Sequence, residues 1–271
     1  MGHSQIAAFA RLAIANTPPT RALEGQKTKI SRTMHGFGYD PIHDEIVVTS
    51  PLTQSILIFR GSAKGEEPPL RVIQGPHTQI LGSAYGALDK VSIDPVNSEI
   101  LLPIVPGGTV KEGGILVFDR QANGDAAPKR VLAGVRGSVA VDAVHNLLVV
   151  NTGGSMQIFD RTASGNAKPK AVIQGPKAGV ANISSFQVYG PNGWIIGGGA
   201  DGSICAWSVN DNGDVPPRWK IPVQQLTGYV ASGIALDPVH KEMILSAAGQ
   251  RVRPTSGIMN SVITFSWPEI F

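Results

Sequence analysis

The sequence has little of several features that would mark a particular class of protein. Its single cysteine, Cys205, excludes an internal disulfide framework and a cysteine-based metal cluster. Only 16% of the 271 residues are charged and 42% are hydrophobic, so the chain lacks the composition of a disordered protein. Aromatic residues make up only 6%, which argues against nucleic-acid recognition by stacking. No apolar run approaches the roughly 18 residues of a membrane-spanning helix, so we expect no membrane span.

The N-terminal segment leaves the cellular location open. The apolar stretch from Ile6 to Ala15 is interrupted by Arg11 and lacks the charge and cleavage pattern of a signal peptide. A start of Met1-Gly2-His3-Ser4 is compatible with the replacement of a removed leader, as in a secreted or periplasmic protein. Cys205 lies in an apolar run, so we interpret it as a small buried hydrophobic residue rather than a nucleophile.

Glycine and proline are abundant instead, with 32 and 20 copies, and both disfavour long helices. They recur in a repeat in which an aromatic residue precedes a loop proline by ten positions. The five pairs are Phe9 and Pro19, Phe59 and Pro69, Phe118 and Pro128, Phe159 and Pro169, and Trp207 and Pro217. In four of them a glycine follows the proline after six positions: Gly25, Gly75, Gly134 and Gly175. This spacing predicts a strand, a loop of fixed length and a second short strand that closes on glycine.

A second half of the repeat is a turn between two strands, at Asp40, Asp94, Asp142, Gly190 and Asp237. Four-stranded units with strands a to d at a period near 48 residues predict an all-β fold, a β-propeller. We expect one domain over residues 1–271 with five four-stranded blades, although six blades remain open. An N-terminal strand d would close the ring by completing the last blade.

The turns resemble those of NHL and SMP-30/gluconolactonase-like propellers, in which strand a ends in a hydrophobic-Asp turn. The Phe-Asp-Arg sequences at 118–120 and 159–161, the Gly-Asp loops and the Arg-Val-Ile-Gln-Gly-Pro closing at 71–76 are similar to bacterial NHL-like repeat proteins. The resemblance implies a propeller, but such blades carry enzymes and binding modules alike.

The substantial variation in loop length falls between strands b and c and between strands d and a, which lie on one face of a propeller. Because variable loops on a constant scaffold carry function, we expect a working face there. Its loops are cationic, so we expect them to attract an anionic ligand. The candidate ligand-binding residues are Lys29, Arg32, Lys111, Arg251 and Arg253. The opposite face is expected to be acidic and to include Asp125 and Asp214.

His35, Asp89 and Arg136 are the candidate catalytic residues, at the expected mouth of the central channel. We expect no metal or cofactor, because few carboxylates converge on the axis. His43, His145 and His240 suggest a zinc set, but they occupy one turn position in separate blades and are interpreted as turn residues. The sequence therefore favours binding of a small or polymeric anionic ligand or of a protein partner. A lactonase- or lyase-type enzyme and a purely structural interaction module stay open, as does the oligomeric state.

Overall fold

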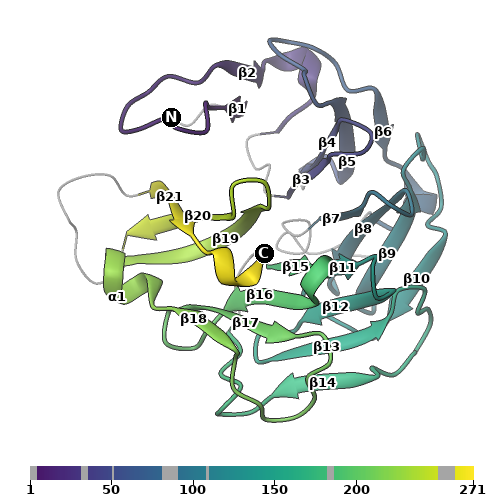
Figure 1. Ribbon diagram of the computed structural model, residues 1–271. Helices are drawn as coiled ribbons and strands as arrows, with labels where there is room; N and C mark the ends of the chain where they lie inside the picture. The colour runs from purple at the N-terminus through teal and green to yellow at the C-terminus, as the bar shows by residue number, and fades with distance from the viewer. Residues whose placement is uncertain are drawn as a thin grey trace. The chain divides into compact units, whose positions relative to one another are not determined.

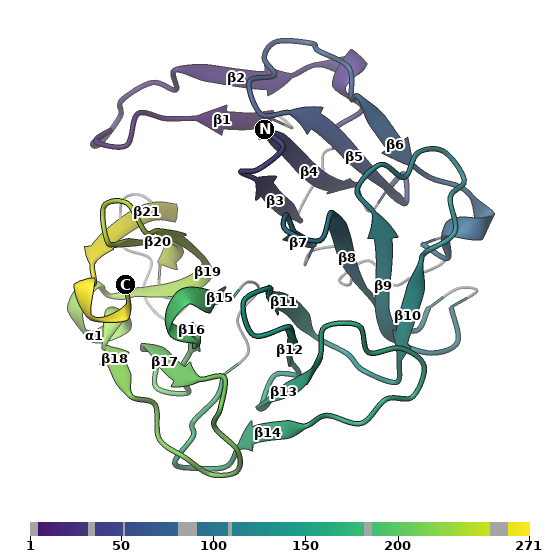
Figure 2. The ribbon, with the colours of Figure 1, turned by 45° about the vertical axis from the view of Figure 1, so that its right-hand side comes forward.

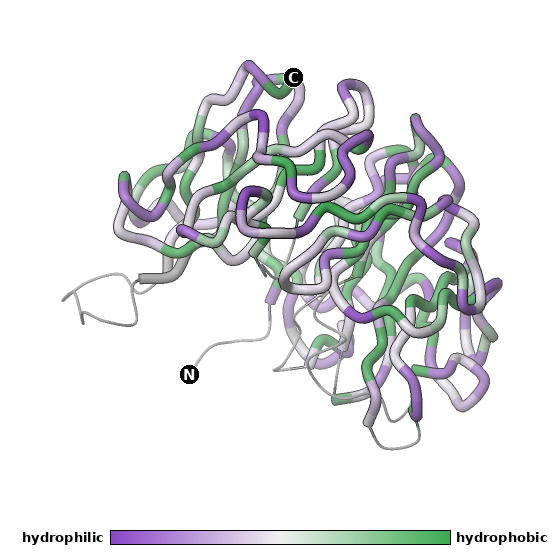
Figure 3. Tube along the Cα trace, turned by 90° about the horizontal axis from the view of Figure 1, so that it is seen from below, coloured by the Kyte–Doolittle hydropathy of each residue, from purple (hydrophilic) through white to green (hydrophobic). Residues whose placement is uncertain are grey.

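The structure is a computed structural model that describes residues 5–31, 36–50, 52–80, 91–107, 110–181, 186–249 and 260–271. Nearly all regular structure in these residues is β-strand, and the one α-helix among them, α1 (Val223–Thr227), has five residues (Figure 1). The chain divides into two units, Met1–Val131 and Leu132–Phe271. Short apolar stretches alternate with hydrophilic ones along the trace, as expected for a chain of short strands and turns (Figure 3).

The first unit contains a strand pair and two antiparallel sheets (Figure 2). The pair is β1 (Gln5–Ala8) with β2 (Arg21–Glu24). Blade 1 consists of β3 (Phe37–Asp40), β4 (Glu45–Ser50), β5 (Ser55–Arg60) and β6 (Arg71–Ile73). Blade 2 consists of β7 (Ser92–Asp94), β8 (Glu99–Ile104), β9 (Gly114–Asp119) and β10 (Arg130–Ala133), with the border between the units inside β10.

The second unit continues the same order of strands. Blade 3 consists of β11 (Ser138–Asp142), β12 (Leu147–Asn151), β13 (Ser155–Asp160) and β14 (Ala171–Gln174). Blade 4 consists of β15 (Gln187–Tyr189), β16 (Trp194–Gly198), β17 (Ile204–Ser208) and β18 (Trp219–Ile221). Blade 5 consists of β19 (Tyr229–Asp237), β20 (Glu242–Gly249) and β21 (Asn260–Ser266).

These sheets confirm the prediction of an all-β chain with five antiparallel β-propeller blades. Four blades have four strands, whereas blade 5 has three within the described residues. Strand β2, which the sequence predicts as the closing strand of the ring, pairs with β1 from Ala8↔Arg21 to Gln5↔Glu24. Closure of the ring by β2 would join the two units and stays a prediction, as does a single domain over residues 1–271.

Strand β4 shows how the core is built. All six of its residues are buried, because both faces of the sheet are covered. Ile46 and Val48 pack with Leu23 of β2, whereas Val47 packs with Ile100 of blade 2. This alternation follows from the opposite directions of successive side chains in a strand. Aromatic residues of the c strands are also part of the core of their blades, and four are fully buried: Phe59, Phe118, Phe159 and Trp207. Each contributes about 2–3 kcal/mol by leaving water.

The long loop between strands c and d crosses to the preceding blade and pairs with its outer strand. We call this contact the seam. Its four parallel bridges are Leu23↔Gly65, Ile73↔Gly124, Leu132↔Gly165 and Ile173↔Gly213. In blade 1, for example, Gln74 N donates to Gly124 O at 2.9 Å, and Gly124 N donates to Val72 O at 2.7 Å. The seam explains the constant spacing in the sequence, because a loop of another length would miss its partner strand.

Strand β18 has no such bridge among the described residues. The residue that follows β18 explains why this unpaired edge strand does not invite the addition of another strand. The residue before the closing glycine donates its N–H to the seam at Glu24, Gln74, Ala133 and Gln174. The corresponding residue after β18 is Pro222, which has no N–H to donate. A proline at an exposed edge is one of the known ways of discouraging strand addition.

Candidate functional site

The candidate site lies where the b–c and d–a loops leave each blade, which we call the loop end. After β2, a 3-10 turn η1 (Gln26–Thr28) leads into the d–a loop. Thr28 Oγ1 donates to Gly25 O at 2.6 Å and accepts from Ile30 N at 3.2 Å. Lys29 ends this turn in a left-handed conformation, with φ 59°, and its side chain is exposed. The backbone of the turn therefore fixes where the Lys29 side chain leaves the blade.

Three of the eight predicted site residues fall within the described part of the chain. Lys29 and Lys111 lie in the first unit, after η1 and before β9, and Arg136 lies in the second unit, before β11. All three side chains are exposed. The other five lie outside the described residues: Arg32, His35, Asp89, Arg251 and Arg253. The candidate catalytic set therefore stays a prediction.

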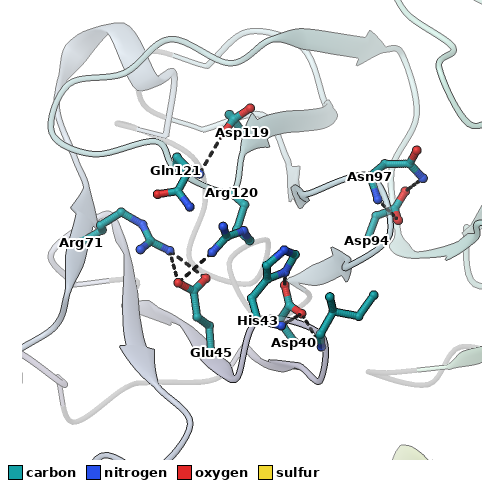
Figure 4. Close-up of polar contacts among 10 residues, drawn as sticks. Asp40, His43, Glu45, Arg71, Asp94, Asn97, Asp119, Arg120 and Gln121 are labelled. Atoms are coloured by element: carbon teal, nitrogen blue, oxygen red, sulfur yellow. Dashed lines mark hydrogen bonds and ion pairs between the residues drawn. The ribbon is translucent and has the colours of Figure 1, made fainter.

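The opposite end of each blade, where the a–b turns lie and strands c end, carries cations of a different kind. We call it the turn end. Glu45, at the start of β4, is buried between Arg71 of the same blade and Arg120 of blade 2 (Figure 4). Arg71 Nη2 lies 2.8 Å from both Glu45 oxygens, and Arg120 Nη1 lies 3.0 Å from Glu45 Oε1. Glu99 repeats the pattern, since it accepts from Arg130 at 2.6 and 2.7 Å.

Pairing with a carboxylate is the rule for cations of the c–d segments. The pairs are Arg60 with Glu67, Arg71 and Arg120 with Glu45, Lys129 and Arg130 with Glu99, Lys170 with Asp160, and Arg218 with Asp211. The loop-end cations differ, because Lys29, Lys111 and Arg136 form no ion pair in the described part of the chain. Most cations of the c–d segments are therefore neutralised within the fold, whereas the described loop-end cations Lys29, Lys111 and Arg136 are left to solvent.

One carboxylate of the loop end is also neutralised within its own blade. Asp201, in the b–c loop of blade 4, forms an ion pair with Lys220 of the edge strand β18. The Lys220 ammonium group and the Ser203 hydroxyl lower the pKa of Asp201 from 3.8 to about 2. The negative charge of Asp201 is therefore compensated within blade 4.

The histidines of the a–b turns have a structural role. Asp142 Oδ1 accepts the amide N–H groups of Val144 and His145 at 3.0 Å, and its Oδ2 lies 2.8 Å from His145 Nδ1. Asp40 with His43 and Asp237 with His240 form the same turn. Each of these histidines is bound by the aspartate of its own turn, which confirms their interpretation as turn residues. Among the described residues, no group of three or more His, Cys, Asp or Glu side chains is arranged to hold a metal.

Cys205 is buried in strand β17, as the sequence predicts. Burial, and secondarily the charge of Asp201, raise the pKa of its thiol to about 11. A thiol with this pKa is protonated at neutral pH and has little nucleophilic character. The structure therefore assigns Cys205 to the core.

Sequence reasoning missed the acidic side of the seam. Asp214, expected on the acidic face, accepts the amide N–H groups of Lys177 and Ala178 in the loop after β14, at 2.7 and 2.9 Å. Asp125 likewise accepts His77 N at 2.7 Å and lies 2.5 Å from His77 Nδ1. These carboxylates thus hold the d–a loops of the preceding blade. The signal was present in the sequence, because an acidic residue follows the seam glycine at Gly65, Gly124 and Gly213.

The comparisons with known proteins add no family to the fold. No family model matches the chain, and no curated protein matches its sequence. No helix in the described residues has both the length and the apolar character needed to cross a membrane. The class that the structure defines is therefore the β-propeller, with five blades and a repeated seam.

Proposed function

We propose that the protein is a binding protein that takes an anionic ligand at the loop end of its blades. One observation carries this proposal: the described loop-end cations Lys29, Lys111 and Arg136 are exposed and unpaired, whereas most c–d cations are neutralised by carboxylates. Unpaired cations on a rigid scaffold attract anions at long range, and their attraction is screened by salt. A cation already paired with a buried glutamate offers less to a ligand, because the pair would have to be broken.

The buried thiol and the turn-bound histidines support binding over covalent catalysis. Among the described residues, neither Cys205 nor the histidines of the a–b turns are placed as a nucleophile and its base. We also propose that the propeller is of the NHL and SMP-30/gluconolactonase-like type. This rests on the Asp turn at the end of strand a, which recurs at Asp40, Asp94, Asp142 and Asp237.

The test compares two double charge reversals of equal net charge. Lys29→Glu with Lys111→Glu changes the loop end, and Lys64→Glu with Lys168→Glu changes two exposed lysines of the c–d loops. Retention on immobilised dextran sulfate is measured as the NaCl concentration at elution. We expect the loop-end variant to elute at clearly lower salt than the wild type and the control variant to elute close to the wild type. Equal shifts in both variants would show attraction to net charge alone and refute the proposal.

The lactonase- or lyase-type alternative depends on His35, Asp89 and Arg136. The wild type and His35→Ala are assayed against a panel of simple lactones. Hydrolysis that His35→Ala abolishes, with dextran sulfate retention unchanged, would replace the binding proposal with an enzyme. Absence of hydrolysis by the wild type, together with the expected retention pattern, would favour binding.

A further inference from the structure

A cavity of about 430 Å³ lies within the first unit, between the β1–β2 pair and the turn end of blade 1. This volume is within the range of pockets that hold small molecules. The residues that give the cavity its chemistry are Ile6, Arg21, Phe37, Tyr39, Asp44 and Ile46. Only Phe37, the first residue of β3, borders a d–a loop, and none of Lys29, Lys111 and Arg136 lines the cavity, so it is separate from the site proposed above.

Asp44 supplies a fixed carboxylate to the cavity. It sits in the a–b turn of blade 1 in a left-handed conformation, with φ 52°, and its Oδ1 accepts the hydroxyl of Tyr39 at 2.8 Å. Gly61 makes room for it, because a Cβ atom at that position would overlap the Asp44 carboxylate. The second oxygen, Oδ2, accepts no hydrogen bond from the described residues. The carboxylate is therefore held in place from one side and available from the other.

Arg21 supplies a cation that the fold leaves unpaired. It begins β2, at the position that Arg71 and Arg130 occupy in β6 and β10. Both counterparts are paired with a buried glutamate, at Glu45 and Glu99, whereas Arg21 forms no ion pair with the described residues. The hydrogen bond to Asp44 raises the pKa of Tyr39, and the Arg21 charge acts on the same phenol in the opposite direction. Arg21, Tyr39 and Asp44 all line this cavity.

The remaining wall is apolar and includes two exposed aromatic rings. Phe37 and Tyr39 lie two residues apart on β3, so their side chains share one face of the strand. Their exposed fractions are 52% and 49%, which is unusual for aromatic residues of an innermost strand. Ile6 of β1 and Ile46 of β4 continue this surface. A ligand that covered these rings would remove a large apolar area from water.

We propose that this cavity binds a small zwitterion with an apolar side chain, such as a free apolar amino acid. The ligand carboxylate pairs with Arg21, its ammonium group pairs with the free oxygen of Asp44, and its side chain covers Phe37 and Ile6. Charge complementarity selects this class. A simple amine would leave Arg21 unpaired and would place a second positive charge near it. A simple acid would leave Asp44 unpaired and would place a second negative charge near it. Only a ligand with both charges matches both groups.

The first test uses the wild-type protein with three probes of one shape. L-Phenylalanine carries both charges, phenethylamine lacks the carboxylate, and 3-phenylpropionate lacks the ammonium group. Saturation-transfer NMR and calorimetric titration measure their affinities. We expect L-phenylalanine to bind at least tenfold more tightly than either analogue. Equal affinity of all three would show apolar occupancy alone and overturn the proposal, as would the absence of binding at millimolar concentration.

The second test assigns each charge to its residue. Asp44→Asn should weaken L-phenylalanine and phenethylamine but leave 3-phenylpropionate unchanged or improved. Arg21→Gln should weaken L-phenylalanine and 3-phenylpropionate but not phenethylamine. A uniform loss for all three probes in both variants, with unchanged circular dichroism, would contradict the assignment. If Asp44→Asn does not fold, Tyr39→Phe removes only the hydroxyl that holds Asp44. This variant should weaken the zwitterion more than the acid, and equal weakening would count against the proposal.

Discussion

The a–b turn of blade 3 predicts a large difference between two neighbouring substitutions, Asp142→Ala and His145→Asn. The Asp142 side chain is fully buried and accepts three hydrogen bonds, from two backbone amides and from the His145 ring. His145 contributes only one bond to this arrangement, and its side chain is 40% exposed. Blade 2 carries out the same task with Asn97, whose Nδ2 donates to Asp94 Oδ2 at 2.8 Å. An asparagine at position 145 can therefore replace the imidazole.

The magnitude follows from the bonds that each change removes. A hydrogen bond to a charged group contributes about 1.5–3 kcal/mol, and a neutral one about 0.5–1.5 kcal/mol. The amides released by Asp142→Ala lie in a surface turn where water can bind them, so we expect a total cost of about 2–4 kcal/mol. His145→Asn keeps every bond and should cost no more than about 0.5 kcal/mol, within the usual range for surface substitutions.

Urea unfolding followed by circular dichroism and by tryptophan fluorescence measures both costs, and coincident transitions verify that one unfolding free energy applies. Asp142→Asn serves as a further control, because its amide oxygen still accepts the backbone N–H groups and should give an intermediate cost. The reasoning is refuted if Asp142→Ala costs less than about 1 kcal/mol. It is also refuted if His145→Asn destabilises the protein as much as Asp142→Ala does.

Two further predictions concern the seam and the loop end. Gly175→Ala places a Cβ at φ 122° on the Asp214 carboxylate and should lower the unfolding free energy by about 2–4 kcal/mol; Gly154→Ala, at an open position, should be nearly neutral in the same urea titration. Lys220→Gln should return the pKa of Asp201 from about 2 toward 3.8 in a carboxyl NMR titration. Because the pKa of Asp201 is lower in the folded state, this pair stabilises the wild type above about pH 4 and loses its contribution as the pH falls toward 2. The unfolding free energies of wild type and variant should therefore differ little at pH 2. A constant difference from pH 2 to 5 would contradict this prediction.

The sequence was sufficient to predict the blades because their residues act locally. A strand of alternating Ile and Val, an Asp at its end and a proline ten residues after an aromatic each specify a short element and its neighbour. The turn role of His145 followed from its recurrence at the same position in other blades. In contrast, the seam joins residues 32 to 52 positions apart, such as Ala133 with Gly165 and Val72 with Gly124. No local sequence pattern predicts such a contact, although the fixed length of the c–d loop is a consequence of it.

The candidate site was less predictable for a physical reason. A cationic residue in a loop has the same sequence signature whether it is paired or free. Arg130 and Arg136 are only six residues apart, but Arg130 is bound to a buried glutamate, whereas Arg136 is exposed and forms no ion pair with the described residues. The difference depends on Glu99, 31 residues away from Arg130. The cavity of the first unit was missed for the same reason, because its residues come from β1, β2, β3, β4 and two turns.

The position of the seam changes where the protein is divided into modules. Because each c–d loop completes the edge of the sheet before it, a cut between two blades leaves one half with an open edge and the other with an unused loop. The segment that could be exchanged as a module therefore does not coincide with one sheet. It runs from one c–d loop to the next. Grafts with these boundaries should preserve the seam contacts, whereas a graft made at sheet boundaries should break two seams. Among the described d strands β2, β6, β10, β14 and β18, only β18 lacks a seam bridge, and Pro222 follows it.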